Sequence, residues 1–365
     1  MDFIPFLDLS RQYQKIKQEL LKASEEVFEA STFSLGPSVE KFEEQFASFC
    51  HVKHAVGVDN GTSAIVLALK ASGIKEKDEV IVPANSFIAT AAAVSHIGAL
   101  PVFADCTTDT WQISPEDVMR KVTSKTKAII GVHLYGMPFD IECIRKIAEE
   151  NKLVLIEDCA QAQGATYNGI SVGNFGKAGT FSFYPVKNLG AYGEAGAIVT
   201  NDDEVSERMK RLRNHGSIEK YVHDEIGFNM RIDALQAAFL SVKLKHLNEW
   251  NLRRREIAEF YKVAIINPKL SFQHVPEKCH SVYHLFVATT EDRDGFRDYL
   301  NHHKIGSGLH YPIPCHLQKA YASLNYSKGD LPNSEYLSEH CLSLPMFPEL
   351  RQSEMEYIVE VINKY

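Results

Sequence analysis

The sequence of 365 residues lacks the patterns of membrane-spanning, secreted and nucleic-acid-binding proteins. It has no stretch of about 18 apolar residues, so we expect no membrane span. The first residues show no basic segment followed by an apolar one, so we expect no secretory signal. There is no strongly basic block, and the formal net charge of -8 argues against a nucleic-acid partner. The most basic run, 253–255, predicts a solvated helix face.

The cysteines form neither a disulfide framework nor a zinc motif. Their number, seven, is odd, and none makes a C-x-x-C pair or has zinc spacing with a histidine. We therefore expect reduced thiols in a cytoplasmic protein, and no metal site. His302 and His303 fall in an expected loop, where we expect them to be solvated and not to bind a metal.

Short apolar runs alternate with helical segments from residue 52 onwards. Two amphipathic helices precede them, the first capped by Ser10 and the second starting after Gly36 and Pro37. The expected strands are 55–58, 79–82, 101–104, 128–134, 153–157, 179–183 and 197–200. Helices are expected between several of them, at 65–71, 89–97 and 141–149. Strands that are apolar throughout predict a mainly parallel α/β sheet of seven strands, with the last one running against the others as an edge addition.

The C-terminal part predicts a smaller α+β domain. Asp233 is the expected cap of a long helix, and a further helix is expected at 252–263. We place the domain boundary near residue 245. This gives a large domain, 1–245, that includes the N-terminal helices, and a small domain, 246–365.

Polar segments follow several expected strands, at the sheet edge where parallel sheets bind ligands. Segment 60–64, Asn-Gly-Thr-Ser-Ala, opens a helix, whose free N–H groups and dipole suit a phosphate. A plain turn with a Ser or Thr cap explains this segment equally well. Asp158, which follows another strand, can pair with a protonated heterocycle nitrogen, or it can simply cap the next helix.

The segment 180–190 contains a lysine, Lys187, among aromatic and small residues. Burial at a strand end would favour its neutral amine, which can attack an aldehyde. The alternative is a surface lysine on a glycine-rich loop. In the last segment, 227–233, Asn229 and Arg231 could bind phosphate, although Arg231 could equally pair with Asp233.

Together these segments, in this order, resemble the DegT/DnrJ/EryC1/StrS family of sugar aminotransferases. The likeness runs from 6–9 to 344–348, and segment 193–196, Gly-Glu-Ala-Gly, departs from the more frequent Gly-Asp-Gly-Gly. The resemblance implies the type I, aspartate aminotransferase-like fold. It also implies pyridoxal 5'-phosphate as the cofactor.

Roles for individual residues follow from the resemblance alone. Lys187 looks like the Schiff-base lysine and proton shuttle, and Asp158 like the partner of the pyridine nitrogen. The implied cofactor contacts are Gly61, Thr62, Ser63 and Ser182 at the phosphate, Phe87 against the ring, Gln161 beside the hydroxyl, and Asn229 from the other subunit of a homodimer. The implied substrate contacts across the dimer interface are Arg231, His310 and Tyr311.

The expected reaction moves an amino group from an amino acid to a nucleotide-linked keto sugar, with glutamate as the expected donor. Family members that remove a hydroxyl have histidine in place of Lys187, so lysine favours transamination. Segment 188–195 resembles members that aminate C3 more than those that aminate C4. The nucleotide, dTDP or UDP, stays open.

Two other classes of protein remain as alternatives. A dinucleotide-dependent oxidoreductase would share the strand and helix pattern, but no G-x-G-x-x-G follows the first strand. A non-catalytic regulator that binds pyridoxal phosphate would keep Asp158 and the phosphate contacts. It would not need Lys187.

Overall fold

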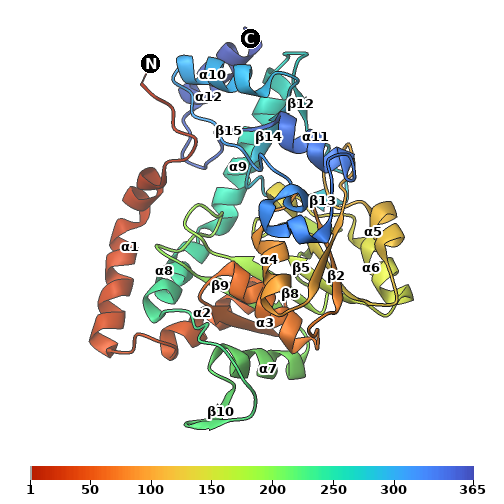
Figure 1. The fold of residues 1–365 in the computed structure, drawn as a ribbon. Helices are drawn as coiled ribbons and strands as arrows, with labels where there is room; N and C mark the ends of the chain where they lie inside the picture. Colours follow the sequence, from red (N-terminus) through yellow and green to blue (C-terminus); the bar gives the residue numbers. More distant parts are fainter. Residues whose placement is uncertain (1) are drawn as a thin grey trace.

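A seven-stranded sheet lies at the centre of the computed structural model, which describes residues 2–365 (Figure 1). The spatial order of its strands is β1 (His54–Val58), β9 (Gly196–Thr200), β8 (Ala178–Ser182), β5 (Val154–Asp158), β4 (Thr126–Val132), β2 (Glu79–Pro83) and β3 (Leu100–Ala104). Each of the expected strands overlaps one of these. The prediction of a mainly parallel α/β sheet is therefore confirmed.

The reversed strand is inside the sheet, so its expected place at an edge is wrong. β9 pairs antiparallel with both β1 and β8, and all its residues are buried. The chain returns from β8 through the loop 183–195 straight into the neighbouring strand, and such a return makes the two strands antiparallel. The edge next to β9 is taken by β1, the first strand of the chain, and β3 lies at the other edge.

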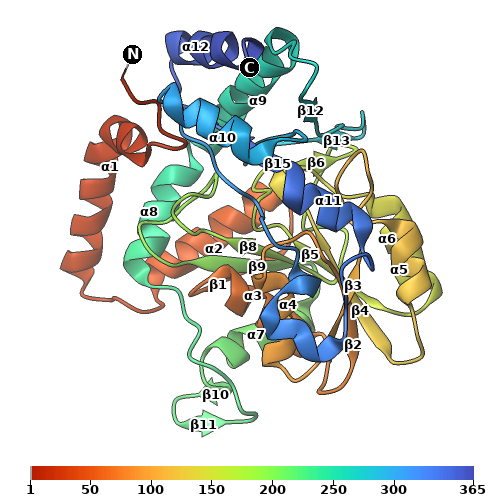
Figure 2. The same ribbon diagram turned by 45° about the horizontal axis from the view of Figure 1, so that its top comes forward.

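Helices cover both faces of the sheet (Figure 2). Alternate strand residues supply the two cores: Ile156 packs with α3 (Gly61–Ala71) and α4 (Ala89–His96), whereas Leu155 packs with α6 (Ile141–Glu150). The other large-sheet helices are α2 (Pro37–Cys50), α5 (Pro115–Lys121), α7 (Asp203–Arg213) and α8 (Ala234–Leu244). This two-sided burial explains why the strands are apolar throughout.

The first helix, α1 (Leu9–Ala30), is capped by Asp8, so the prediction of Ser10 as the cap is wrong. The Asp8 carboxylate accepts hydrogen bonds from the Ser10 backbone N–H at 3.0 Å and from its hydroxyl at 2.6 Å. A carboxylate just ahead of the helix reaches the first free N–H groups, whereas Ser10 is already inside the helix. Asp233 is at the N-cap position of α8, as expected, but makes no side-chain capping bond.

The chain then continues into α9 (Leu247–Ala264), which contains the basic run 253–255. The expectation of a solvated face is wrong for Arg254, which is buried and donates to the Met346 carbonyl oxygen at 2.8 Å. Its side of α9 packs against the C-terminal core, and carbonyl groups there replace water.

His302 is the last residue of α10 (Arg293–His302), and His303 caps that helix, so neither lies in the expected loop.

The remaining elements complete the C-terminal part and several small sheets. They are η1 (Leu134–Gly136), β6 (Thr166–Tyr167), β7 (Ile170–Ser171), β10 (Ser217–Glu219), β11 (Val222–His223), β12 (Ser271–Phe272), β13 (Cys279–His280), β14 (Phe286–Thr289), η2 (Cys315–Leu317), η3 (Lys319–Leu324), α11 (Pro332–His340), β15 (Cys341–Leu344) and α12 (Gln352–Asn363). A separate core joins α9, α10 and α12, and Ile4 also belongs to it. The division near residue 245 stays a proposal.

Among residues 2–365, no helix has both the length and the apolar character needed to span a bilayer.

Candidate active site

Asp158 and Lys187 meet at one edge of the central sheet. Asp158 ends β5 and Lys187 follows β8, and these two strands are parallel neighbours, so their carboxyl ends lie together. Burial lowers the pKa of Lys187 to about 8, and the nearby charge of Asp158 opposes this shift. The site therefore holds an amine that is partly neutral near physiological pH, opposite a carboxylate.

The Asp158 carboxylate is held by hydrogen bonds on both oxygens. Thr90 Oγ1 donates to Oδ2 at 2.8 Å, and the Ala160 N–H donates to Oδ1 at 3.1 Å. Burial raises the pKa of Asp158 above its usual value, and these hydrogen bonds and the charge of Lys187 oppose the rise. A buried carboxylate of this kind suits a protonated ring nitrogen as its partner. The alternative, that Asp158 caps a following helix, is wrong, because β5 is followed by the strand β6 (Thr166–Tyr167) and not by a helix.

Thr90 is absent from the residues predicted for the site. It lies on α4, after the Asn-Ser-Phe segment 85–87 that follows β2, and its hydroxyl also contacts the Ser86 hydroxyl at 3.0 Å. The sequence carried one signal: a polar residue stands at the start of an otherwise alanine-rich helix that begins at the ligand-binding edge. A contact with Asp158, far away in the sequence, could not be read from that signal.

Gln161, predicted to contact the cofactor, is hydrogen-bonded to Tyr311, predicted to contact the substrate, and to Tyr135, which was not predicted for the site. Its Oε1 accepts from the Tyr135 N–H at 2.6 Å, and its Nε2 donates to the Tyr311 hydroxyl at 3.0 Å. The Tyr135 hydroxyl donates in turn to the His310 carbonyl oxygen at 2.5 Å. The loop that carries His310 and Tyr311 is thereby fastened to the end of β5.

The aromatic side chains of this loop border the site. The Phe87 ring lies 5.5 Å from the Tyr311 ring, and Phe87 is 54% exposed. His310 stacks on Phe6 at 5.6 Å, and its Nδ1 lies 2.9 Å from the Ser343 hydroxyl. Burial and the charge of Lys187 lower the pKa of His310 to about 4. His310 is therefore neutral at pH 7.

The N-terminus of α3 forms a cradle beside Ser182. Asn60 Oδ1 caps the helix by accepting from the Ser63 N–H at 2.8 Å. Within residues 2–365, the N–H groups of Gly61 and Thr62 have no hydrogen-bond acceptor. A Cβ at Gly61 would lie 2.7 Å from the Ser182 Cβ, so only glycine lets the backbone approach this hydroxyl. Free donors at a helix N-terminus fit a phosphate group.

Three predicted site residues are placed differently from the rest. Ser63 is buried, and its backbone N–H is already taken by the Asn60 side chain that caps the helix. Arg231 donates to Asn214 Oδ1 at 2.7 Å and not to Asp233. Asn229 is exposed, and in the described part of the chain no hydrogen bond or ion pair links it or Arg231 to Lys187. Their roles at the cofactor and substrate remain predictions.

Asn188 anchors the backbone next to Lys187. Its Nδ2 donates to Asn251 Oδ1 at 2.9 Å and to the Val282 carbonyl oxygen at 3.0 Å. Its Oδ1 lies 3.2 Å from His284 Nδ1, and because Oδ1 can only accept, His284 donates through Nδ1. Burial, together with the charge of Lys187, lowers the pKa of His284 well below its usual value. His284 is a neutral neighbour of Lys187 that the sequence patterns did not indicate.

His133, Glu157 and Cys159 form a buried cluster behind the site, with potential ligand atoms within 4.8 Å of one another. Glu157 accepts three backbone hydrogen bonds from segment 173–176, and its Oε2 lies 3.1 Å from His133 Nε2. These contacts occupy the acceptor positions that a metal would need. We interpret Glu157 as a clamp on this segment.

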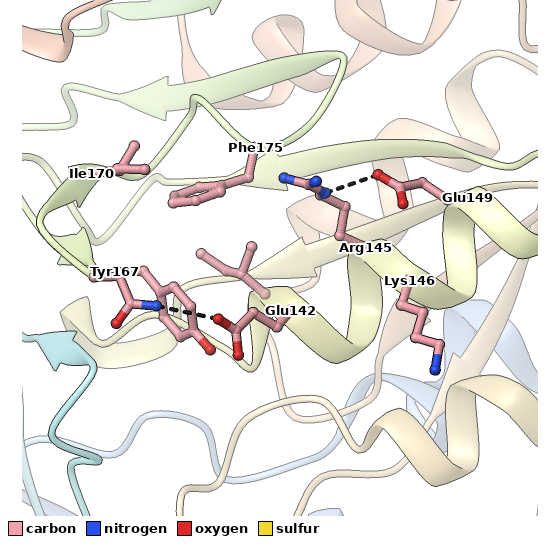
Figure 3. A pocket seen from close by; sticks show the side chains of 9 residues that line it. Glu142, Arg145, Lys146, Glu149, Tyr167, Ile170 and Phe175 are labelled. Atoms are coloured by element: carbon pink, nitrogen blue, oxygen red, sulfur yellow. Dashed lines mark hydrogen bonds and ion pairs between the residues drawn. The ribbon is translucent and has the colours of Figure 1, made fainter.

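A surface pocket elsewhere contains none of the predicted site residues (Figure 3). It lies between α6 and the β6–β7 hairpin and is lined by Ile141, Glu142, Arg145, Lys146, Glu149, Tyr167, Asn168, Ile170 and Phe175. Arg145 pairs with Glu149 at 2.9 Å, and Lys278 pairs with Glu142 at 2.5 Å. Its charges compensate one another, and nothing in it resembles the reactive group around Lys187.

Comparisons with known proteins agree with this geometry. Residues 14–363 match the model of the DegT/DnrJ/EryC1/StrS aminotransferase family. The chain is 46% identical to a dTDP-3-amino-3,6-dideoxy-alpha-D-galactopyranose transaminase of Aneurinibacillus thermoaerophilus, with 99% of each protein covered. It is 45% identical to a protein of Geobacillus stearothermophilus named pleiotropic regulatory protein, covering 99% of this chain and 98% of that protein.

Solved structures of other proteins have a similar fold. The structure of DesV from S. venezuelae in complex with a ketimine intermediate superposes with a TM-score of 0.98 at 40% identity, covering 100% of this chain and 98% of that one. The structure of NtdA from Bacillus subtilis with bound cofactor PMP has a TM-score of 0.93 at 32% identity, covering 99% and 85%. The prediction of an aminotransferase fold is confirmed.

Proposed function

The chain belongs to the DegT/DnrJ/EryC1/StrS aminotransferase family, and on this premise we propose that it transfers an amino group from an amino acid to a nucleotide-linked keto sugar. It is a pyridoxal-phosphate-dependent enzyme. One observation carries the proposal. A half-buried amine, Lys187, faces a buried carboxylate, Asp158, where two parallel strands end.

The residues around this pair fit pyridoxal phosphate. When bound, the cofactor supplies an aldehyde that takes up the amino group and a ring that accepts electrons. We propose that Lys187 would hold the cofactor at its aldehyde group through Nζ and that Asp158 would bind its ring nitrogen. The free N–H groups of Gly61 and Thr62, with the Ser182 hydroxyl, would hold the phosphate.

Lys187 is also suited to move protons. Because burial lowers its pKa to about 8, its Nζ can accept a proton from the donor Cα and return it at a neighbouring carbon near neutral pH. The hydrogen bonds from Thr90 and Ala160 favour the charged form of Asp158, which can hold the proton on the ring nitrogen. His310, neutral at pH 7, adds no positive charge that would compete with the protonated ring nitrogen for Asp158.

We further propose a homodimer that shares its active sites. Large apolar side chains along and just after α1 are exposed, Leu21 by 50%, Phe28 by 57% and Phe33 by 54%, which supports an interface on this side of the molecule. α1 and α8 lie side by side there (Figures 1 and 2). Asn229, exposed and unconnected to its own site, would contact the cofactor of the partner subunit, and Arg231 would reach the substrate.

The finer assignments follow the same reasoning. The name of the relative that forms a 3-amino sugar supports amination at C3, as segment 188–195 indicates. Glutamate is the proposed donor. All seven cysteines are free, which supports a reducing compartment such as the cytoplasm.

A non-catalytic regulator is the second candidate, and the name of the Geobacillus relative favours it. Such a protein would bind the cofactor without exchanging amino groups. The reactive placement of Lys187 argues for catalysis, because a regulator does not need an amine with a lowered pKa.

Absorption spectroscopy separates these possibilities. Pyridoxal phosphate added to the purified protein should give a visible absorption band, and borohydride should fix the cofactor on Lys187, as peptide mapping would show. Glutamate should remove the band, and a nucleotide-linked 3-keto sugar should restore it. A band that no amino acid removes would support the regulator, and the absence of any band would contradict both proposals.

A further inference from the structure

We propose that Lys243 is a positioning residue for Lys187, because it fixes the backbone of the loop that carries the reactive amine. This inference rests on the proposed function. Lys243 lies near the end of α8, and its Nζ donates to the Gly190 carbonyl oxygen at 2.5 Å. Gly190 follows Lys187 in the loop 183–195.

The surroundings of Lys243 are unusual for a lysine. Its side chain is 2% exposed, and within residues 2–365 it makes no ion pair with a carboxylate. Its ammonium lies 4.8 Å from the centre of the Tyr192 ring and 6.0 Å from that of Trp250. Burying a lysine without an ion-pair partner is costly, and an apolar side chain would fill the space without that cost. The hydrogen bond that only the amine can make is the one to the Gly190 carbonyl oxygen.

Gly190 transmits this contact to Lys187. A Cβ at Gly190 would collide with the Pro185 carbonyl group and lie 3.0 Å from the Tyr184 carbonyl oxygen, so the loop closes tightly on itself. The N–H of Lys187 donates to that same Tyr184 oxygen at 2.8 Å. A shift of Gly190 therefore shifts the backbone from which the Lys187 side chain extends.

A second residue of α8 holds the same loop. The N–H of Tyr192 donates to Gln236 Oε1 at 2.9 Å, and Gln236 Nε2 donates back to the Tyr192 carbonyl oxygen at 3.3 Å. Lys243 and Gln236 thus attach the segment 190–192 to one side of α8. Gln236 is partly exposed, so its hydrogen bonds compete with water and contribute less than the buried bond of Lys243.

The test compares Lys243→Met with Lys245→Met, a matched substitution of an exposed lysine at the end of the same helix. Apoprotein is mixed with pyridoxal phosphate across a range of pH. The rate of capture on Lys187 and its pH midpoint are measured by absorbance, borohydride fixation and peptide mapping. Thermal unfolding of each apoprotein is recorded in parallel.

We expect Lys243→Met to slow capture about tenfold and to move its pH midpoint, since a misplaced amine loses its geometry and environment. Lys245→Met should match the wild type. A Lys243→Met protein that melts earlier but captures the cofactor with the wild-type rate and midpoint would show a merely structural role and overturn the inference. Wild-type protein that captures no cofactor would instead overturn the proposed function.

Lys243→Met could fail to fold, and Gln236→Ala then decides the question. This change removes two hydrogen bonds from Tyr192 and leaves the buried lysine in place. A smaller slowing in the same direction, with a shifted midpoint, supports the positioning role of α8. Capture identical to the wild type in Gln236→Ala would overturn it.

Discussion

Two lysine amines meet the loop 183–195: Lys187 belongs to it, and Lys243 contacts its Gly190 from α8. The two amines differ in what surrounds them. Burial lowers the pKa of Lys187 to about 8 and that of Lys243 to about 8 as well. Lys243 donates to a backbone carbonyl and is enclosed by aromatic rings, whereas the Nζ of Lys187 has no hydrogen-bond partner within residues 2–365. Desolvation alone therefore does not make a lysine reactive; it must also leave the amine free to meet a ligand.

The largest expected effect is the loss of turnover in Lys187→Met. Removal of the nucleophile and proton carrier should lower kcat by at least about 10³–10⁴-fold. The same substitution at Lys243 should lower it only about tenfold, because the reacting amine is still present. Steady-state assays with glutamate and a keto-sugar nucleotide measure both, and far-UV circular dichroism checks the fold. Comparable losses in the two variants would break the distinction between them.

Asp158→Asn should have the next largest effect. Loss of the carboxylate that would hold the ring nitrogen proton should lower kcat by about 10²–10³-fold. The charge of Asp158 raises the pKa of Lys187, so its loss should move that pKa further down and leave Lys243 unchanged. The acidic limb of the pH profile for cofactor capture reports this shift. An unmoved limb would mean that the two side chains do not interact.

A smaller effect is expected on the stability of the apoprotein. The pKa of Lys187 is about 8 in the folded chain and near 10.5 in the unfolded one, so the unfolded state binds more protons between these values. Stability contributed by this group therefore rises as pH increases from about 8 to 10.5. Below pH 8 the buried charge is destabilising, and Lys187→Met should stabilise the apoprotein by about 1–2 kcal/mol at pH 7.

The same substitution at Lys243 should gain less. It removes a buried charge too, but it leaves the Gly190 carbonyl without its donor, which costs about 1–3 kcal/mol. Urea unfolding of both apoproteins at pH 7 and pH 10 measures the difference. If Lys187→Met lowers stability at pH 7, the amine is better solvated than its burial indicates.

Glu349→Gln should have the smallest effect. Glu349 raises the pKa of Lys243, so removing its charge should lower the pKa of that lysine and leave that of Lys187 in place. Turnover should change by no more than about threefold, which corresponds to about half a pKa unit. NMR titration of methylated lysines follows both amines. A shift of Lys187 of the same size would show that the two sites are electrostatically coupled.

The sequence predicted the sheet well because its strands are buried on both faces. A strand such as β5 has apolar side chains on both faces, and this continuous run can be recognised without knowing which strands lie beside it. The place of β9 was wrong because strand order depends on pairing partners, which local patterns do not contain. The burial of Arg254 was missed for a similar reason, since its partner, the Met346 carbonyl, comes from the far end of the chain.

The candidate site shows the same division. The aromatic and small residues around Lys187 predicted a desolvated amine, and its pKa is indeed lowered by burial. Thr90, His284 and Lys243 were not predicted, because each acts through a contact with a residue distant in the sequence. Residue type and spacing indicate which groups can react, while the supporting contacts depend on the tertiary fold.

Gln161 has a consequence for anyone who wishes to change the substrate of this enzyme. Its amide uses one end for the Tyr135 N–H and the other for the Tyr311 hydroxyl, so the loop that carries Tyr311 and the backbone at Tyr135 share a single side chain. A loop transplanted into this position without a phenol would leave the buried amide N–H unpaired. A loop grafted at residues 310–316, where we propose the substrate contacts, must therefore keep Tyr311 or replace Gln161 along with it.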